Sequence, residues 1–276
     1  MSIRFAEVGD RIWVLRHPVL DVNVTLVLGD EAALLVDTLS TADQATDLAV
    51  AVRAITAYPW TIVNTHHHFD HCFGNATLAG DPDRPVYAHE TTLALLRDHP
   101  DEVRRQAYEE MLASEPELAA ELRRTPVLAP SHAVHREAAL DLGGRPVTLR
   151  HLGRGHTEGD LVVRVPDADV LIAGDLVEES GPPAFADSYP LDWAGTLAEL
   201  LRHTTAGTRV VPGHGAVVDR DFVRAQHDQL TALGWLIREG HCDHVPAERV
   251  AAQAPFGPES ALVAVRRGYA ELTDGT

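Results

Sequence analysis

Four side chains within residues 66–71 are of the types that bind metal ions, and they follow the pattern His-x-His-x-Asp-His. Imidazole nitrogens and carboxylate oxygens are the ligands that a borderline divalent ion such as zinc prefers. His66 and His68 lie two residues apart, so an extended backbone directs both side chains to the same side. Asp70 and His71 follow where the chain turns, and they can face a second position close by. The spacing therefore predicts two adjacent metal sites rather than one.

This run of ligand-type residues lies between a predicted strand and a predicted helix. Residues 60–64 are apolar and rich in β-branched side chains, which is typical of a short strand, and residues 73–78 read as the opening of a helix. A strand-to-helix turn in an α/β protein holds several side chains in a fixed geometry at the edge of a sheet. This context favours a metal site over the plain alternative, a solvated polar loop.

Three more ligand-type side chains follow at the ends of other predicted strands. His156 lies in a Gly-His-Thr-Glu-Gly-Asp segment, where the glycines allow the backbone to turn tightly. Asp175 follows an apolar strand, at a place where a bridging carboxylate would sit. His214 lies in a Pro-Gly-His-Gly segment after a last short strand. Together with residues 66–71, these positions give five histidines and two aspartates, enough for a complete two-metal site.

Two other polar residues near these motifs have structural interpretations. Asp37 ends an earlier predicted strand, and its carboxylate is placed to cap the helix that begins near residues 41–43. It is equally placed to orient a metal-bound histidine through a hydrogen bond, and the two roles are compatible. His67, between two ligand-type neighbours, is predicted to face away from the metal site and to be structural.

Composition limits the classes of function. The chain has 276 residues, of which 45% are apolar and 23% charged, so it can bury a substantial core. Its formal net charge is −18, and such a surface repels nucleic acid and anionic membranes. We therefore expect a small-molecule substrate. All 23 basic residues are arginine, and the lack of lysine excludes a Walker-type phosphate loop and a Schiff-base mechanism.

The location is predicted from three features. Charged residues such as Arg4, Glu7 and Asp10 interrupt the start of the chain, so it does not read as a signal peptide. The apolar runs are shorter than the ~20 residues needed to span a bilayer. The two cysteines, Cys72 and Cys242, do not make a disulfide framework. We expect a cytoplasmic protein, and the sequence does not determine its oligomeric state.

The rest of the pattern predicts a single α/β domain of α+β character over residues 1–276. Short apolar runs separated by turn residues predict strands, and residues 42–57 have the apolar spacing of an amphipathic helix. Residues 91–125 read as a helical insertion and residues 220–276 as a helical tail. The irregular segment 181–191 and the apolar hairpin tip at 17–20 are predicted to wall the site.

The motifs and their order resemble the metallo-β-lactamase superfamily, from about Val24 to His214. The resemblance implies a four-layer αβ/βα sandwich that binds metal at one edge of two packed sheets. It implies that one ion is held by His66, His68 and His156. It implies that the other is held by Asp70, His71 and His214, with Asp175 bridging the two. Asp37 and Asp160 match positions that support the ligands in that superfamily.

The resemblance also implies a function, namely hydrolysis of a small-molecule thioester, ester or lactone by a hydroxide that bridges two divalent ions. Zinc is the expected metal, with iron and manganese as alternatives. Asp70 is in addition a candidate for passing a proton to the leaving group. Members with cysteine where Asp175 stands include true zinc β-lactamases, so the aspartate here favours the hydroxyacylglutathione hydrolase (glyoxalase II) type or an unassigned hydrolase. The glutathione-binding region of that type is not recognisable in this chain.

Two other functions compete with hydrolysis. The first is that of a mononuclear iron-dependent dioxygenase acting on a thiol or persulfide, which the resemblance allows on the same fold. Members of that kind typically use fewer of these ligands, so the presence of all seven favours two metals. The second is non-catalytic metal binding, which the complete ligand set disfavours.

Overall fold

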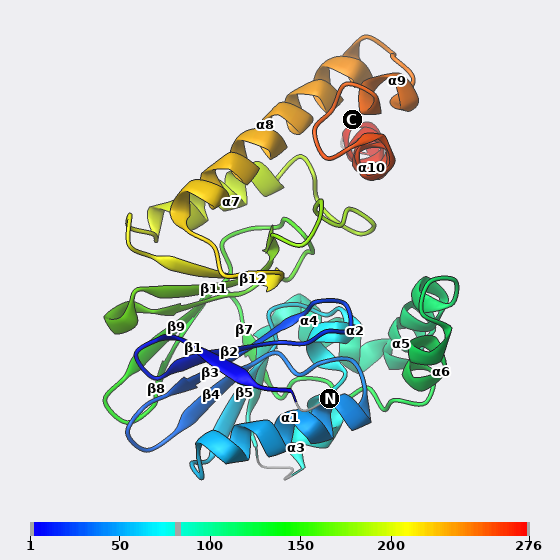
Figure 1. Ribbon diagram of the computed structural model, residues 1–276. Helices are drawn as coiled ribbons and strands as arrows, with labels where there is room; N and C mark the ends of the chain where they lie inside the picture. The colour runs from blue at the N-terminus through cyan, green and yellow to red at the C-terminus, as the bar shows by residue number, and fades with distance from the viewer. Residues whose placement is uncertain (1–2, 81–83, 275–276) are drawn as a thin grey trace.

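The computed structural model describes residues 3–80 and 84–274, which form two packed sheets with helices on both outer faces (Figure 1). In this part of the chain, seven strands make the first sheet, in the order β1-β2-β3-β4-β5-β6-β7. Neighbours are antiparallel from β1 to β4 and parallel from β4 to β7. The strands are β1 (Phe5–Gly9), β2 (Ile12–Arg16), β3 (Asn23–Leu28), β4 (Ala33–Val36), β5 (Trp60–Val63), β6 (Val86–His89) and β7 (His132–Val134).

The second sheet has the strand order β12-β11-β10-β9-β8. Its pairs are antiparallel except for β11 and β12, which run parallel. The strands are β8 (Glu137–Asp141), β9 (Pro146–Arg150), β10 (Val162–Val165), β11 (Val170–Glu178) and β12 (Arg209–His214). Strand β11, predicted only over residues 170–173, continues through Asp175 to Glu178.

The helices are distributed along the whole chain, and a short 3-10 helix, η1 (Pro166–Ala168), joins β10 to β11. In the first half lie α1 (Ala42–Ile55), α2 (Phe69–Cys72), α3 (Asn75–Ala79), α4 (Glu90–Asp98), α5 (Pro100–Met111) and α6 (Pro116–Leu122). In the second half lie α7 (Trp193–Arg202), α8 (Arg220–Cys242), α9 (Ala247–Ala251) and α10 (Pro258–Asp274). Helical structure begins at Phe69, earlier than the predicted residue 73.

Alternating side chains explain why the sheets pack face to face. In β4, Leu34 and Val36 point into the cluster between the two sheets, while Ala33 and Leu35 point to the outer helices. Successive side chains of a strand face opposite sides, so a strand that is buried on both faces reads as a continuous apolar run. The inner cluster is completed from the second sheet by residues such as Leu149, Val163 and Ile172.

Helices cover the outer face of each sheet and complete the four layers. Helices α1 and α3 pack on the first sheet, through Ala45, Leu48, Val52, Leu78 and Ala79. Helices α7 and α8 cover the second sheet, in the upper part of Figure 1, around the fully buried Trp193, and α9 and α10 pack on α8 at its far end. The predicted four-layer αβ/βα sandwich is confirmed.

The two helical regions expected from the sequence are helical in the structure. Helices α4, α5 and α6 occupy the predicted insertion, and α5 and α6 lie together at one side of the molecule (Figure 1). They pack on α2 through an apolar cluster that includes Phe69, Phe73 and Leu96. Helices α8, α9 and α10 occupy the predicted tail. Among the described helices, none is both long and apolar enough to cross a membrane.

Candidate metal centre

Parallel strand pairs bring the candidate ligands together from both sheets. Val36 of β4 is paired with Val63 of β5, so the residues that follow these two strands leave the same edge of the first sheet. His66 follows β5, and the chain then turns into α2, which carries Asp70 and His71. In the second sheet β11 and β12 are also parallel, and they carry Asp175 and His214.

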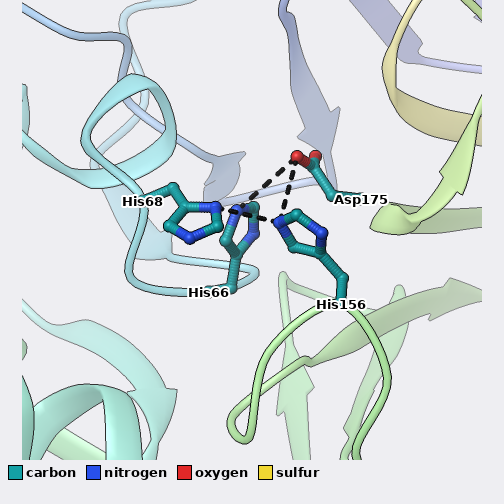
Figure 2. A group of neighbouring side chains, drawn as sticks. All are labelled: His66, His68, His156 and Asp175. Atoms are coloured by element: carbon teal, nitrogen blue, oxygen red, sulfur yellow. Dashed lines mark hydrogen bonds and ion pairs between the residues drawn. The ribbon is translucent and has the colours of Figure 1, made fainter. Parts of the chain in front are cut away.

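The first group of candidate ligands comprises His66, His68, His156 and Asp175 (Figure 2). Each offers one ligand atom, and these atoms all lie within 4.8 Å of one another. Nδ1 of His68 lies 2.9 Å from Nε2 of His156, which in turn lies 3.4 Å from Oδ2 of Asp175. Nε2 of His66 lies 3.7 Å from the same oxygen. The three imidazoles and the carboxylate therefore converge on one point.

The second group comprises Asp70, His71 and His214, again with ligand atoms within 4.8 Å of one another. Nε2 of His71 lies 3.2 Å from Nε2 of His214, and the latter lies 3.3 Å from Oδ2 of Asp70. Asp175 also faces this group, since its Oδ1 lies 3.1 Å from Nε2 of His71 and its Oδ2 lies 3.3 Å from Nε2 of His214. The carboxylate of Asp175 thus lies between the two groups, as a bridging ligand would.

The chemistry of this cluster fits metal ions. His66 is 1% exposed, and its Nε2 has no hydrogen-bond partner among the described residues. An unpaired buried polar nitrogen costs about 1–3 kcal/mol, a cost that a metal ligand bond would remove. The donors are imidazole nitrogens and carboxylate oxygens, which suit zinc, iron or manganese. The structure brings the seven predicted ligands together.

Burial and charge set the protonation of the cluster. Burial lowers the pKa of His66 well below its usual value and that of His156 to about 4, so both imidazoles are neutral near pH 7, the form that binds metal. Burial would raise the pKa of Asp175, but the surrounding histidines, His71 first, hold it well below its usual range. Asp175 is therefore an anion at the centre of the site.

Asp37 contacts a candidate ligand and does not cap a helix. Its Oδ2 lies 2.8 Å from Nδ1 of His71, and its Oδ1 accepts a hydrogen bond of 2.8 Å from the backbone N–H of Thr65. Helix α1 is instead capped by Thr41, whose hydroxyl accepts from the N–H of Gln44. The capping role predicted for Asp37 is wrong because Asp37 lies four residues before the cap, Thr41, and its carboxylate contacts His71 instead.

Asp160 supports the site through the backbone turn that carries His156. Its two oxygens accept hydrogen bonds from the N–H and the hydroxyl of Thr157, at 2.9 and 2.7 Å. Burial raises the pKa of Asp160 to about 7.

Close packing is also required beside the bridging position, because a Cβ on Gly213 would lie 1.7 Å from Oδ1 of Asp175. Only glycine at position 213 leaves room for the carboxylate of Asp175 where it lies.

The cluster opens into a cavity of about 270 Å³. Its lining includes the candidate ligands His68, Asp70, His156, Asp175 and His214. The hairpin tip supplies Leu20 and helix α5 supplies Glu110 and Met111, while the loop predicted to wall the site supplies Gly181, Pro182, Ala184, Ala186 and Asp187. The ring of Phe185 packs against that of Trp193, and the guanidinium of Arg154 lies over the ring of Tyr189.

Three carboxylates of the cavity wall, Glu110, Glu178 and Asp187, do not appear among the sequence-predicted site residues. Glu178 ends the strand that carries Asp175, but a spacing of three residues predicts opposite faces of a strand. The pairing register of β11 shifts between Gly174 and Glu178, and this irregularity brings both carboxylates to the cavity. Asp187 and Glu110 lie in a loop and on a helix without a motif, so the sequence holds no signal for them.

Comparison with known proteins places the chain in a family. A model described as the metallo-beta-lactamase superfamily matches residues 17–214. The metallo-beta-lactamase type 2 of Bacillus cereus is 28% identical over 172 residues, which is 61% of this chain and 57% of that protein. The type 2 enzyme of Bacteroides fragilis is 23% identical over 198 residues, 70% of this chain and 68% of that protein. The match thus spans little more than half the length of the Bacillus relative.

Solved structures share the fold at lower identity. The metallo-beta-lactamase from Pontibacter korlensis superposes with a TM-score of 0.67 at 19% identity, covering 83% of this chain and 99% of that one. DIM-1 metallo-beta-lactamase superposes with a TM-score of 0.65 at 18% identity, covering 84% and 98%. Because the superfamily model extends over most of the chain and its range contains all the candidate ligands, the protein belongs to the metallo-beta-lactamase superfamily.

Proposed function

We propose that this chain is a binuclear metal-dependent hydrolase of a small-molecule thioester, ester or lactone. The observation that carries the proposal is the position of Asp175 between two groups of ligand atoms at the wall of an open cavity. Bound there, two divalent ions would activate a water molecule as nucleophile, by lowering its pKa towards ~7, and would polarise the substrate carbonyl. The neutral His66 and His156 are ready to bind metal without releasing a proton.

The charge of the cavity wall bears on the choice of substrate. Glu110, Glu178 and Asp187 add carboxylates to the wall, and no arginine is among the described residues that line it. Apart from the proposed metal ions, a substrate carboxylate would find no cationic side chain to pair with, and it would lie near the carboxylate of Asp187, where like charges at short range cost free energy. This supports neutral or cationic esters, thioesters and lactones over β-lactams, whose ring system carries a carboxylate.

The test of this function begins with metal content per chain, measured by elemental analysis of protein purified without added metal or chelator. We expect about two zinc ions per chain. A panel of neutral, cationic and anionic thioesters, esters and lactones, together with a chromogenic cephalosporin, then follows, and we expect turnover among the uncharged or cationic thioesters, esters and lactones.

Two results would contradict the proposal. One is about one iron per chain with oxygen consumption on addition of a thiol or persulfide, which would indicate the dioxygenase. The other is hydrolysis of the cephalosporin in preference to all of the esters, thioesters and lactones, which would indicate a β-lactamase.

Asp70 is placed to act on the leaving group. Its side chain lines the cavity, and its Oδ2 lies 3.3 Å from Nε2 of His214. We propose that it takes up the proton that the attacking water releases and passes this proton to the departing oxygen or sulfur. Asparagine keeps an oxygen at the ligand position but cannot carry the proton, so Asp70→Asn should retain metal and lower kcat by about 100-fold or more, because general acid catalysis contributes roughly 10²–10⁴-fold. Elemental analysis and steady-state kinetics check this, and unchanged turnover with both ions bound would refute the proton transfer.

A further inference from the structure

Asp187 contacts a candidate ligand from the side that faces away from the cluster. Its Oδ2 lies 3.1 Å from Nε2 of His68, while Nδ1 of the same ring lies 2.9 Å from Nε2 of His156. In Figure 2 the ring of His68 points toward His66 and His156. The imidazole of His68 therefore has one nitrogen on the ligand group and the other on a carboxylate.

A carboxylate on the outer nitrogen of a histidine ligand fixes its tautomer, holds its ring and increases its basicity. Three of the other imidazoles of the cluster show the same outward arrangement with different partners, whereas Nδ1 of His156 is buried without a hydrogen-bond partner among the described residues. Nδ1 of His71 lies on Asp37, and Nδ1 of His214 lies 2.8 Å from the backbone oxygen of Leu20. Nδ1 of His66 lies 3.0 Å from the hydroxyl of Thr65. Asp187 thus does for His68 what Asp37 does for His71.

The two carboxylates differ in how they are held. Asp37 is buried at the end of a strand, whereas the side chain of Asp187 is 41% exposed and lies on a segment between β11 and α7 that forms neither helix nor strand in the described chain. A partly exposed carboxylate exchanges its hydrogen bond with water easily, so how firmly Asp187 holds the ring of His68 depends on the position of the loop.

Helix α10 supplies the contacts that fix this loop. Nε of Arg267 donates to the backbone oxygen of Ser188 at 2.6 Å, and its Nη1 donates to the backbone oxygen of Ala186 at 3.0 Å. These carbonyls flank Asp187 on both sides. The guanidinium of Arg267 also lies 5.9 Å from the ring centre of Tyr189. One arginine therefore holds the backbone on either side of the carboxylate.

Arg267 lies outside residues 17–214, the range that the superfamily model matches. We propose that Asp187 is a positioning residue for His68 and that helix α10, through Arg267, holds Asp187 in place. The helical tail thereby sets the metal affinity of the site. This inference rests on the proposed function only in requiring that the cluster binds metal.

A different reading of the same geometry is a third metal site. His67 and His68 both present Nε2 to Asp187, at 3.2 and 3.1 Å, and the three ligand atoms lie within 4.8 Å of one another. That site would need His68 to serve one ion through Nε2 and another through Nδ1. We favour the positioning role, because a single N–H donated to the carboxylate satisfies the ring, and the experiment separates the two.

The experiment measures metal binding by the full chain. Zinc affinity is determined by competition with a chromogenic chelator, and the cobalt(II)-substituted protein gives an absorption spectrum that reports the ligands. We expect Asp187→Asn to weaken binding of one of two ions by about 10–100-fold and to shift the cobalt bands. Asp187→Glu should recover part of the affinity. Arg267→Ala should weaken the binding of the same ion by about 3–10-fold, since Arg267 acts on Asp187 only through the loop.

Arg266→Ala is the matched control, because Arg266 is the neighbouring residue of α10 and pairs on the surface with Glu248 at 2.8 Å. We expect it to leave the affinity unchanged. Circular dichroism of each metal-free variant confirms that it is folded. Wild-type affinity and cobalt bands in Asp187→Asn would overturn the proposal. So would loss of one ion from three with the other two bound normally, since Asp187 would then be a ligand itself.

The role of Asp187 and the proposed function can be judged separately, because the first is tested by metal binding and the second by hydrolysis. A wild-type chain that binds two ions but hydrolyses no ester, thioester or lactone would contradict the function and leave the positioning role to be judged on affinity alone. A wild-type chain that binds no metal would contradict both.

Discussion

Replacing Asp175 by alanine is expected to empty both metal positions and to lower kcat/KM by about 1000-fold or more, equal to about 4 kcal/mol of transition-state stabilisation. Its Oδ1 lies 3.1 Å from Nε2 of His71 and its Oδ2 lies 3.4 Å from Nε2 of His156, so one substitution removes an oxygen from each group. It also removes the anion that offsets the charge of two divalent ions. Elemental analysis and steady-state kinetics measure the two effects.

Glu178→Gln is the control for this prediction. Glu178 ends the same strand and offers a ligand atom within 4.8 Å of those of Asp175 and His214, so it is the carboxylate that competes for the bridging role. We expect the Glu178→Gln protein to keep about two ions per chain. If it lost both ions while Asp175→Ala kept them, the bridging ligand would be Glu178, and the assignment of Asp175 would be wrong.

Local patterns in the sequence predict much of this molecule. The alternation of Leu34 and Val36 with Ala33 and Leu35 predicts a strand buried on both faces, and the structure places it between the inner cluster and the helices. The spacing within residues 66–71 predicts two adjacent sets of ligands, and in the structure His66 and His68 fall in one group of ligand atoms and Asp70 and His71 in another. In these cases the cause is local, since backbone geometry over a few residues decides where the side chains point.

The contacts that were not predicted join distant parts of the chain. Asp187 and His68 are 119 residues apart, and Arg267 and Ser188 are 79 residues apart. Neither Asp187 nor Arg267 belongs to a motif, so only the packing of α10 beside the loop brings them to the site. Glu178 was missed for a different reason. A shift of pairing register in β11 turns its side chain to the face that Asp175 occupies, and the apolar pattern of the strand gives no sign of this shift.

The second large effect is expected at Trp193, where the core meets the metal centre. The side chain is fully buried at the start of α7, and its Nε1 donates to the backbone oxygen of Leu176 at 3.1 Å. Its ring centre lies 5.5 Å from that of Phe185 and 5.7 Å from that of His156. We expect Trp193→Ala to lower the free energy of unfolding by about 3–5 kcal/mol, because it leaves a large cavity in the core.

Urea denaturation of the metal-free chain measures this effect, since bound metal would add its own stabilisation. Trp193→Phe keeps most of the ring but loses one of the two hydrogen bonds to the oxygen of Leu176, which still accepts from Nε2 of Gln226 at 2.9 Å, so it should cost about 0.5–1.5 kcal/mol. Trp235 is 61% exposed, and Trp235→Ala should change the free energy of unfolding by less than about 0.5 kcal/mol. Because the ring of Trp193 packs on His156, Trp193→Ala should also weaken zinc binding, whereas Trp235→Ala should not. Equal stability of the two alanine variants would show that Trp193 does not join the core to the metal centre.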